Sequence, residues 1–376
     1  MSYRLEDREG VADGIRRIVA EELDDAVAGL RTGDDRDTAI HEARKSLKKA
    51  RSALRLARTD LPSSTRRTEN EAMRDASRRL SGARDAQVML DTLESLTHAI
   101  PAPPNDEVRS LGRELVARRA VLASQLEGDT GLLEDVAGEL EAIRERVEAW
   151  DLGDQRWGSI AEGAEIIHDR GRAAMKQALR GDADDDWHEW RKRVKDLWYA
   201  GRIIAPITGP QIEGLVEEAD ELSNVLGDHN DLAVLLEAAG DRPGLRAAIV
   251  ARRDALRRVA ATLGRRLYGE KPKAFARRLE ALLAAHEDAN AASARWLTPA
   301  AAEQARELLA AKPSADPAGR RRIATGLRQL GLRTSDYESE LPRRVGGFAA
   351  EDLELLMARG TVRVGEPPDP ATLGGL

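Results

Sequence analysis

The sequence predicts an all-α fold made of two related halves, followed by a small C-terminal extension. Apolar residues recur at helical spacing in one segment after another, and no segment shows the alternation expected of a strand run. The 376 residues are poor in aromatic side chains (3%) and rich in Ala, Leu, Arg and Glu, which are strong helix formers. A basic motif occurs twice, at corresponding places in the two halves, and this repetition predicts a shared architecture.

The expected helices fall into two sets joined by a linker-like stretch, DLGDQRWGS. Short loops between successive helices are typical of antiparallel bundles, so we expect repeat one over about 8–150 and repeat two over about 155–295. A break is expected near Ser81–Gly82. In the extension, 298–376, we expect two helices and a short strand at TVRV, and we predict no function for it. The expected helices span about 11–30, 37–61, 66–100, 106–127 and 130–150, then 160–180, 186–205, 211–239, 243–268 and 272–290.

Composition excludes several classes of protein. The chain has no Cys, which rules out disulfides, a thiol nucleophile, a Cys-ligated zinc and an iron–sulfur cluster. No apolar run approaches the roughly 18 residues of a membrane span, and MSYRLEDREG lacks the apolar core of a signal peptide. We therefore expect no membrane contact and a cytoplasmic location. The net charge of −7 argues against a nucleic-acid binder driven by bulk charge.

The repeated motif begins at a histidine in each half. His41 opens HEARKSLKKARSALR and His188 opens HEWRKRVKDLWYAGR, which share Glu, Arg, Lys, Lys and Arg at the same five distances from the His. Further on, LSGARDAQVML corresponds without a gap to LGDHNDLAVLL, so that Asp85 matches Asp231. This many identities at fixed spacing indicates an internal repeat.

Helical geometry places the shared basic residues on one side of each helix. At about 100° and 1.5 Å per residue they occupy a stripe about 100° wide and about 21 Å long. The opposite side carries apolar residues such as Leu47 and Leu54, or Trp190 and Val194, which we expect in the core. The first basic ridge comprises His41, Arg44, Lys45, Lys48 and Arg55, and the second comprises His188, Arg191, Lys192, Lys195 and Arg202.

A ridge of this kind predicts an anionic ligand. Residues 43–59 contain seven Lys or Arg and no acid, although the chain has 66 acidic residues. Each like-charged pair on a helix costs a few tenths of a kcal/mol, so a solvated face normally mixes both signs. Two ridges, each about four cations long, suit a polyanion, because Arg forks contact phosphate oxygens and Lys adds point charge.

These paired H-x-x-R-K-x-x-K helices and the downstream L-x-x-x-[RN]-D pattern resemble the CHAD family, the conserved histidine α-helical domain, over residues 8–295. The resemblance implies two four-helix bundles related by a pseudo-twofold axis, with the basic helices facing each other across a basic central groove. It also implies binding of inorganic polyphosphate and a place on polyphosphate granules. We expect Asp85 and Asp231 to orient other side chains. The candidate polyphosphate-binding residues are His41, Arg44, Lys45, Lys48, Arg51, Arg55, Arg84, His188, Arg191, Lys192, Lys195 and Arg202.

The second half departs from the first at two positions. Asn230 stands where the first half has Arg84, which makes a phosphate contact there doubtful, and Asp196 replaces Lys49, which weakens the second ridge. No E-x-E-x-K segment precedes the domain, so the triphosphate-tunnel domain that often accompanies the family, and its catalysis, are not expected. No cofactor is expected, and the oligomeric state is left open.

The sequence also bears on three alternatives to polyphosphate binding. A metal site is not expected: the ridge histidines have no H-x-x-x-H partner, Glu42 and Glu189 point about 100° away from them, and GDHND (227–231) is interpreted as a helix break or cap. A metal-dependent phosphohydrolase with a ridge histidine as phosphoacceptor stays open, although the chain has no Walker loop. Nucleic-acid binding is less expected, because only Tyr199 is well placed for base stacking.

Overall fold

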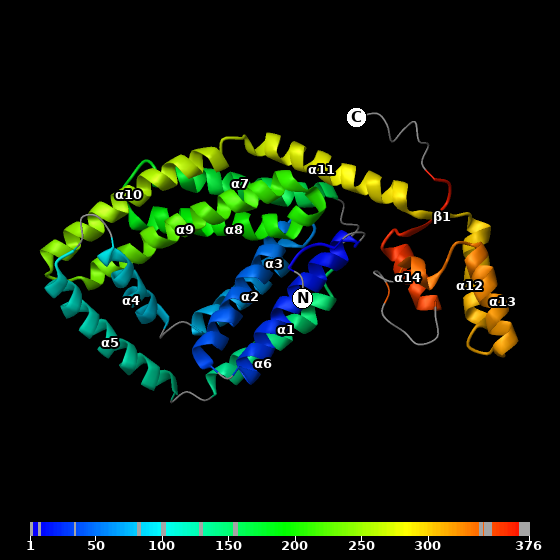
Figure 1. Ribbon diagram of the computed structural model, residues 1–376, viewed down its shortest axis with the longest axis horizontal. Coiled ribbons are helices and arrows are strands. Elements are labelled where there is room, and N and C mark those ends of the chain that lie inside the picture. The colour runs from blue at the N-terminus through cyan, green and yellow to red at the C-terminus, as the bar shows by residue number, and fades with distance from the viewer. Residues whose placement is uncertain are drawn as a thin grey trace. The chain divides into compact units, whose positions relative to one another are not determined.

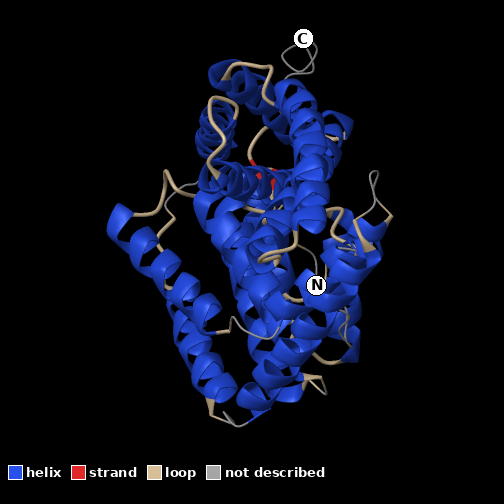
Figure 2. Ribbon diagram, turned by 90° about the vertical axis from the view of Figure 1, so that its left-hand side faces the viewer, coloured by secondary structure: helices blue, strands red, loops and turns tan. Residues whose placement is uncertain are grey.

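The structure, a computed structural model, describes residues 3–6, 9–33, 35–80, 84–98, 103–127, 131–152, 157–337, 341 and 348–367. These residues are nearly all helical (Figure 2), which confirms the predicted fold class. The chain divides into two compact units, one of residues 1–5 and 12–280, the other of residues 6–11 and 281–376. No helix in the described ranges is long and apolar enough to cross a bilayer.

The first unit contains the repeated motif. Its predicted helices are confirmed within a few residues at each end, and the expected break at Ser81–Gly82 lies outside the described residues. The helix α11 leaves this unit after Glu280. The helices are α1 (Val11–Thr32), α2 (Arg36–Leu56), α3 (Ser63–Arg79), α4 (Arg84–Thr97), α5 (Asn105–Glu127), α6 (Leu132–Glu148), α7 (Trp157–Ala178), α8 (Asp184–Thr208), α9 (Pro210–Ala238), α10 (Pro243–Leu267) and α11 (Pro272–Ser293).

The second unit is a small α+β module. Its two strands pair in parallel, with Arg295 opposite Val362, and the helices cover an apolar core that includes Leu309 and Leu353. The strand expected near 361–364 is confirmed as β2, whereas β1 is only three residues long and gave no signal in the sequence. Its elements are β1 (Arg295–Leu297), α12 (Pro299–Ala311), α13 (Pro317–Gln329), a short 3₁₀ helix (Thr334–Tyr337), α14 (Ala350–Ala358) and β2 (Val362–Val364).

The helices α2 and α8 carry the two basic ridges and are built as predicted. Asp35 caps α2 by accepting a hydrogen bond from the amide of Thr38 at 3.0 Å. The sides opposite the ridges are buried: Leu47 and Leu54 on α2, and Trp190 on α8, are fully shielded from solvent. Core packing therefore fixes the rotation of both helices and turns the ridges away from the interior.

Close helix packing orders the second half. The helices α7, α8, α9 and α10 pack each on the next (Figure 1). A Cβ on Gly264 would lie 2.4 Å from the Trp190 ring, and one on Gly171 would lie 2.2 Å from the hydroxyl of Tyr268. Since real Cβ contacts are never this short, only glycine allows these helices to approach so closely.

The helices α4 and α5 pack against α9 and α10 rather than inside a bundle confined to their own half. Their leucines share one apolar cluster with those of α9 and α10, including Leu93, Leu111, Leu232 and Leu245. The first half of the sequence therefore does not form a bundle separate from the second half. The physical reason is that α9 continues unbroken for 29 residues, so its second half presents leucines to α4.

The same continuity corrects a second prediction. Residues 227–231, GDHND, were expected to break or cap a helix, but they lie inside α9. Leu226 and Leu232, on either side of them, are both buried, and the side chain of His229 is buried between them. Burial of this helix face outweighs the low helix propensity of Gly, Asp and Asn.

Candidate functional site

The C-terminal part of α2 meets the middle of α8, and both segments carry ridge residues. The hydroxyl of Ser52 donates a hydrogen bond to the backbone oxygen of Asp196 at 3.3 Å. Close by, Nη1 of Arg55 lies 3.3 Å from a carboxylate oxygen of the same Asp196. One helix from each half of the chain therefore contributes to a common surface.

Cations from both helices gather around Lys48. Partial desolvation and, after it, the positive charges of Arg44, Arg191, Lys195 and Arg51 together lower the pKa of Lys48 to about 8. Among the side chains that the structure describes, no carboxylate lies within ion-pair distance, 4.0 Å, of Arg44, Lys48, Arg191 or Lys195. We call Arg44, Lys48, Arg191 and Lys195 the central cation cluster.

Aromatic rings support the cations of the second ridge. The ammonium of Lys195 and the guanidinium of Arg202 each lie 5.0 Å from the centre of the Trp198 ring, within the range of cation–π attraction. Tyr199, which the sequence placed on the ridge side, is buried, and its ring packs edge-on against Tyr3 at 6.0 Å. Burial raises the pKa of Tyr199 to about 12. These rings position cations and fill the interior, a role that helical spacing alone did not reveal for Trp198.

His188 is held by the residue whose phosphate contact was in doubt. Its Nδ1 lies 2.6 Å from Oδ1 of Asn230, and Nδ2 of Asn230 donates to Asp231 at 3.3 Å. Because the carboxylate can only accept, the amide oxygen faces His188, and Nδ1 carries the proton. Desolvation, followed by the charge of Lys192, lowers the pKa of His188. Asn230 thus connects His188 to Asp231, and the orienting role of Asp231 stays a prediction.

The glutamates of the repeated motif lie closer to the ridges than predicted. Lys45 pairs with Glu42 at 3.0 Å, and Lys192 approaches Glu189 at 3.7 Å. His41 lies 3.7 Å from Glu42, so the prediction that this carboxylate points away is wrong, because a long glutamate side chain bends back along the helix. All these groups are substantially exposed, and ion pairs of this kind contribute about 0–1 kcal/mol, so a polyanion can displace the glutamates.

Three cations on or near the ridges pair with buried carboxylates. Lys49 binds Glu22 of α1 at 2.8 Å, and both side chains are largely buried. Asp196 contacts Arg55 at 3.3 Å and Arg193 at 2.8 Å. The substitution of Lys49 by Asp196 between the halves therefore acts on Arg55 of the first ridge, not only on the second ridge as predicted.

Of three further candidates, only Arg51 has a side chain that the structure describes. Nε of Arg51 donates to Asn70 at 3.0 Å, and desolvation together with Arg55 lowers the pKa of Arg51 to about 10. Arg84 and Asp85 begin α4, and their side chains lie outside the described part of the structure. Their predicted roles therefore stay predictions.

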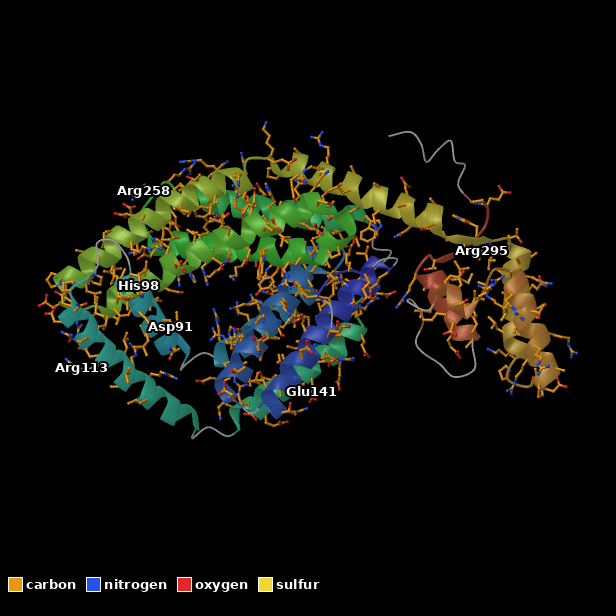
Figure 3. The ribbon with its side chains drawn as sticks, viewed as in Figure 1. Asp91, His98, Arg113, Glu141, Arg258 and Arg295 are labelled. Atoms are coloured by element: carbon orange, nitrogen blue, oxygen red, sulfur yellow. The ribbon has the colours of Figure 1, made fainter. Side chains whose placement is uncertain are left out.

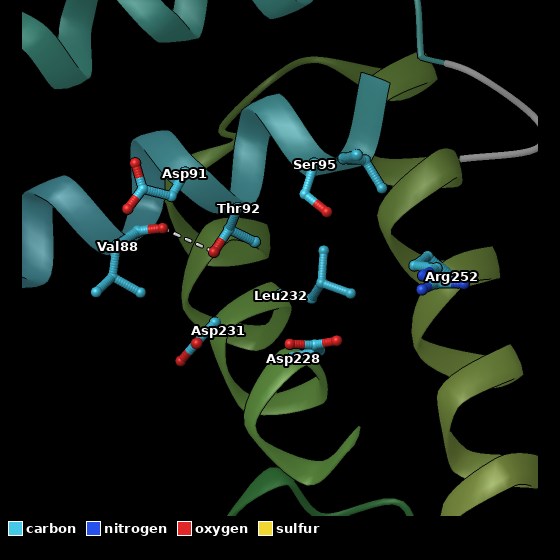
Figure 4. A pocket seen from close by; sticks show the side chains of 9 residues that line it. Val88, Asp91, Thr92, Ser95, Asp228, Asp231, Leu232 and Arg252 are labelled. Atoms are coloured by element: carbon cyan, nitrogen blue, oxygen red, sulfur yellow. Dashed lines mark hydrogen bonds between the residues drawn. The ribbon is translucent and has the colours of Figure 1, made fainter. Parts of the chain in front are cut away.

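His229, in the GDHND segment considered above as a metal site, is already engaged by other side chains. His229 is buried, and its Nε2 accepts a hydrogen bond from Arg257 at 3.1 Å, which uses the lone pair that a metal would need. A separate cavity of about 280 Å³ is lined by Asp228 and Asp231 of α9, together with Asp91 of α4 and Arg252 of α10 (Figure 4). Burial and the neighbouring Asp231 raise the pKa of Asp228. Within the described ranges, no group of three or more His, Asp or Glu is placed to hold a metal ion.

Comparison with known proteins identifies the family. The CHAD domain family matches residues 17–240, more than half of the chain. The crystal structure of the CHAD domain from the plant Ricinus communis is 19% identical, with a TM-score of 0.44, and the match covers 74% of this chain and 94% of that one. No curated protein matches. With its two basic helices inside the matched range, the chain belongs to the CHAD domain family.

Proposed function

We propose that the protein binds inorganic polyphosphate, a long polyanion, along the basic ridges of α2 and α8, without catalysing its breakdown. The observation that carries this proposal is the central cation cluster. Cations on both helices disfavour the charged form of Lys48. In the described part of the chain, no carboxylate lies within 4.0 Å of the four clustered side chains. Holding such charges together is unfavourable without a ligand, so a bound polyanion relieves repulsion and gains attraction in one step.

The chemistry of the cluster favours a chain of phosphates over a single one. Cations lie on helices from both halves, and each ridge spans about 21 Å, room for several phosphate units. Arg44 and Arg191 offer guanidinium forks, while Lys48 and Lys195 add point charge. Displacement of Glu42 and Glu189 would free Lys45 and Lys192 as outer contacts.

The surroundings of the cluster disfavour nucleic acid. Base recognition on a single strand needs aromatic faces open to stacking. Trp198 already carries two cations near its ring, and Tyr199 is buried against Tyr3. A phosphate-only ligand needs no stacking surface, so the arrangement suits polyphosphate better.

A binding titration with long-chain polyphosphate at two salt concentrations tests the proposal. We expect tight binding that weakens steeply with salt, because each cation–phosphate contact releases counterions. The double variant K48E/K195E should abolish binding while the helical circular dichroism stays unchanged. The control is R258E/R265E on α10, which carries the same change of charge outside the ridges (Figure 3 labels Arg258).

Two further outcomes would overturn the proposal. Displacement of polyphosphate by single-stranded DNA or RNA at equal phosphate concentration would make the site a general nucleic-acid surface. Release of orthophosphate with Mg²⁺ or Mn²⁺, lost on H41N or H188N, would make the protein a phosphohydrolase. If binding is confirmed, we expect a fluorescent fusion to gather on polyphosphate granules and K48E/K195E to disperse.

A further inference from the structure

A second cationic site lies where the first basic ridge ends. A cavity of about 610 Å³ opens where the C-terminal end of α2 meets α3, α7 and α8. Seven of its eleven lining residues are arginines, and none is acidic. Only one of the seven, Arg55, belongs to a ridge as defined above. Arg51 and Arg193 come from the ridge-bearing helices α2 and α8, and the other four are Arg58, Arg66, Arg67 and Arg170. We call this the arginine cavity.

Close packing of α7 on the end of α2 creates the cavity. A Cβ on Gly163 would lie 1.9 Å from the backbone oxygen of Leu56, so the two helices touch through their backbones here. Thr59 reinforces this contact by donating to the backbone oxygen of Ser159 at 3.3 Å. Arg170 lies about two helical turns beyond Gly163, and so lies on the same side of α7.

The four added arginines form no close ion pair in the described part of the chain. None of Arg58, Arg66, Arg67 and Arg170 has a carboxylate within 4.0 Å there. Desolvation, then Arg170 and Arg66, lowers the pKa of Arg58, which places these three charges near one another. Nε of Arg66 is buried and has no hydrogen-bond partner. A buried unpaired donor of this kind is costly and is suited to an anionic ligand.

The rest of the wall is only partly neutralised. Asp196 lies beside Arg55 and Arg193, and Glu189 also pairs with Arg193 at 2.6 Å. Arg51 donates to an uncharged amide, that of Asn70. The cavity therefore keeps several uncompensated positive charges.

The first turn of α3 adds neutral donors. Its N-cap is Pro62, which gives no side-chain cap, and Ser63 and Ser64 line the cavity. The first amides of a helix lack partners inside the helix and point their positive dipole end outward. Serine hydroxyls, these amides and converging guanidinium forks can together surround a tetrahedral oxyanion.

The charge of the cavity matches the end of a phosphate chain rather than its middle. A terminal phosphate has three free oxygens and carries close to two negative charges near neutral pH, as a phosphomonoester does. An internal phosphate of a chain has two free oxygens and one charge. Arg51 links the two sites, because its charge acts on Lys48 on one side and it is acted on by Arg55 and Arg193 on the other.

We propose that the arginine cavity binds a terminal phosphate group, and that α2 leads a polyphosphate chain from the central cation cluster into it. The part concerning the chain rests on the proposed function. Binding of the terminal group itself does not, because pyrophosphate presents the same group without a long chain. The same chemistry thus has two sources, the end of a polyphosphate or a free small phosphate compound.

Calorimetric titration of the full chain with pyrophosphate tests the site. We expect R66Q/R170Q to lower the affinity about tenfold or more, the loss of two charge-assisted contacts. The control R258Q/R265Q, with two arginines removed from α10, should change it little. R67Q/R170Q alters two exposed side chains and gives a second test if the first variant folds poorly. Equal affinity in the cavity variants and the control would overturn the proposal.

Two further arms separate the sources and the two proposals. Short polyphosphate with free ends should bind better than the same chain with blocked ends, and R66Q/R170Q should remove that difference if the source is a chain end. If only pyrophosphate responds, the source is a small free phosphate compound. K48Q/K195Q should lose long-chain binding but keep pyrophosphate affinity within about threefold, because screening limits charge effects beyond about 10 Å. The proposal for the arginine cavity and the proposal for the ridges can therefore fail separately, the first in pyrophosphate binding and the second in long-chain binding.

Discussion

Asp196 of α8 bridges the two halves of the chain, since its carboxylate lies 3.3 Å from Arg55 of α2 and 2.8 Å from Arg193 of its own helix. The corresponding position in the first half is Lys49, which binds Glu22 instead. Asp196 therefore joins the two related helices through its carboxylate as well as through its backbone oxygen, and the charge available to a ligand depends on that carboxylate.

Replacement of Asp196 by asparagine should strengthen polyphosphate binding and weaken the fold. Arg55 would lose its carboxylate partner and Arg193 would keep only Glu189, so more positive charge becomes available to the ligand. We therefore expect severalfold higher affinity and a steeper salt dependence. Loss of the charged hydrogen bond should lower the free energy of unfolding by about 1–3 kcal/mol. Titration and urea denaturation measure the two effects. Weaker binding in D196N would show that Asp196 instead orients Arg55 for the ligand.

Polyphosphate affinity should rise as pH falls from about 8 towards 6, in part through His188. Its pKa lies below the ordinary value in the free protein, because of desolvation and Lys192. A phosphate at Nε2 favours the protonated ring, so binding takes up a proton, and lower pH favours binding. The difference in pH slope between the wild type and H188Q isolates this contribution, because titration of the polyphosphate ends cancels. An identical slope in both would remove His188 from the site.

Lys48 should set an alkaline limit to binding. With its pKa lowered to about 8, it loses its charge as pH rises through that range, and the bound polyanion shifts the loss upward. We expect wild-type affinity to fall between about pH 8 and pH 10, and K48R to fall less, because arginine stays protonated. K45R, on the half-exposed flank of the ridge, is the matched control and should not flatten the curve.

Gly163 should be sensitive to a single methyl group. G163A forces a Cβ to within 1.9 Å of the backbone oxygen of Leu56, so α7 must shift away from α2, at a cost of about 1–3 kcal/mol. G138A is the matched control: Gly138 lies inside α6 with nothing within 4 Å of a Cβ, and alanine there should stabilise the helix by about 0.5–1 kcal/mol. Thermal denaturation of both variants measures the contrast, and equal stabilities would show that this contact is not tight.

Helical periodicity was sufficient to predict which sides of α2 and α8 are buried. Burial of Leu47 and Trp190 opposite the ridges depends on their spacing alone, and the structure confirms it. The proximity of Lys48 and Lys195 was expected only from the family resemblance, because periodicity places residues on a helix but does not say which helices meet. The side chains of Arg84 and Asp85 lie outside the described part of the structure.

Other features depend on contacts between distant segments and left no local pattern. From the sequence, Asn230 indicated the loss of a phosphate contact relative to Arg84. In the structure its side chain is hydrogen-bonded to His188, 42 residues away along the chain. Arg66 and Arg170 occur in no repeated motif, and only the approach of α7 to α2 brings them together. The interpretation of GDHND as a break relied on local propensity, which burial of the helix face overrode.

The apolar cluster shared by α4, α5, α9 and α10 makes the first unit indivisible. A fragment ending after α6 would expose the leucines of α4 and α5 to water, and a fragment beginning at α7 would expose those of α9 and α10. Neither fragment could bury its own apolar surface, so we expect neither to fold alone. Co-expression of the two fragments should be needed to obtain both as folded protein.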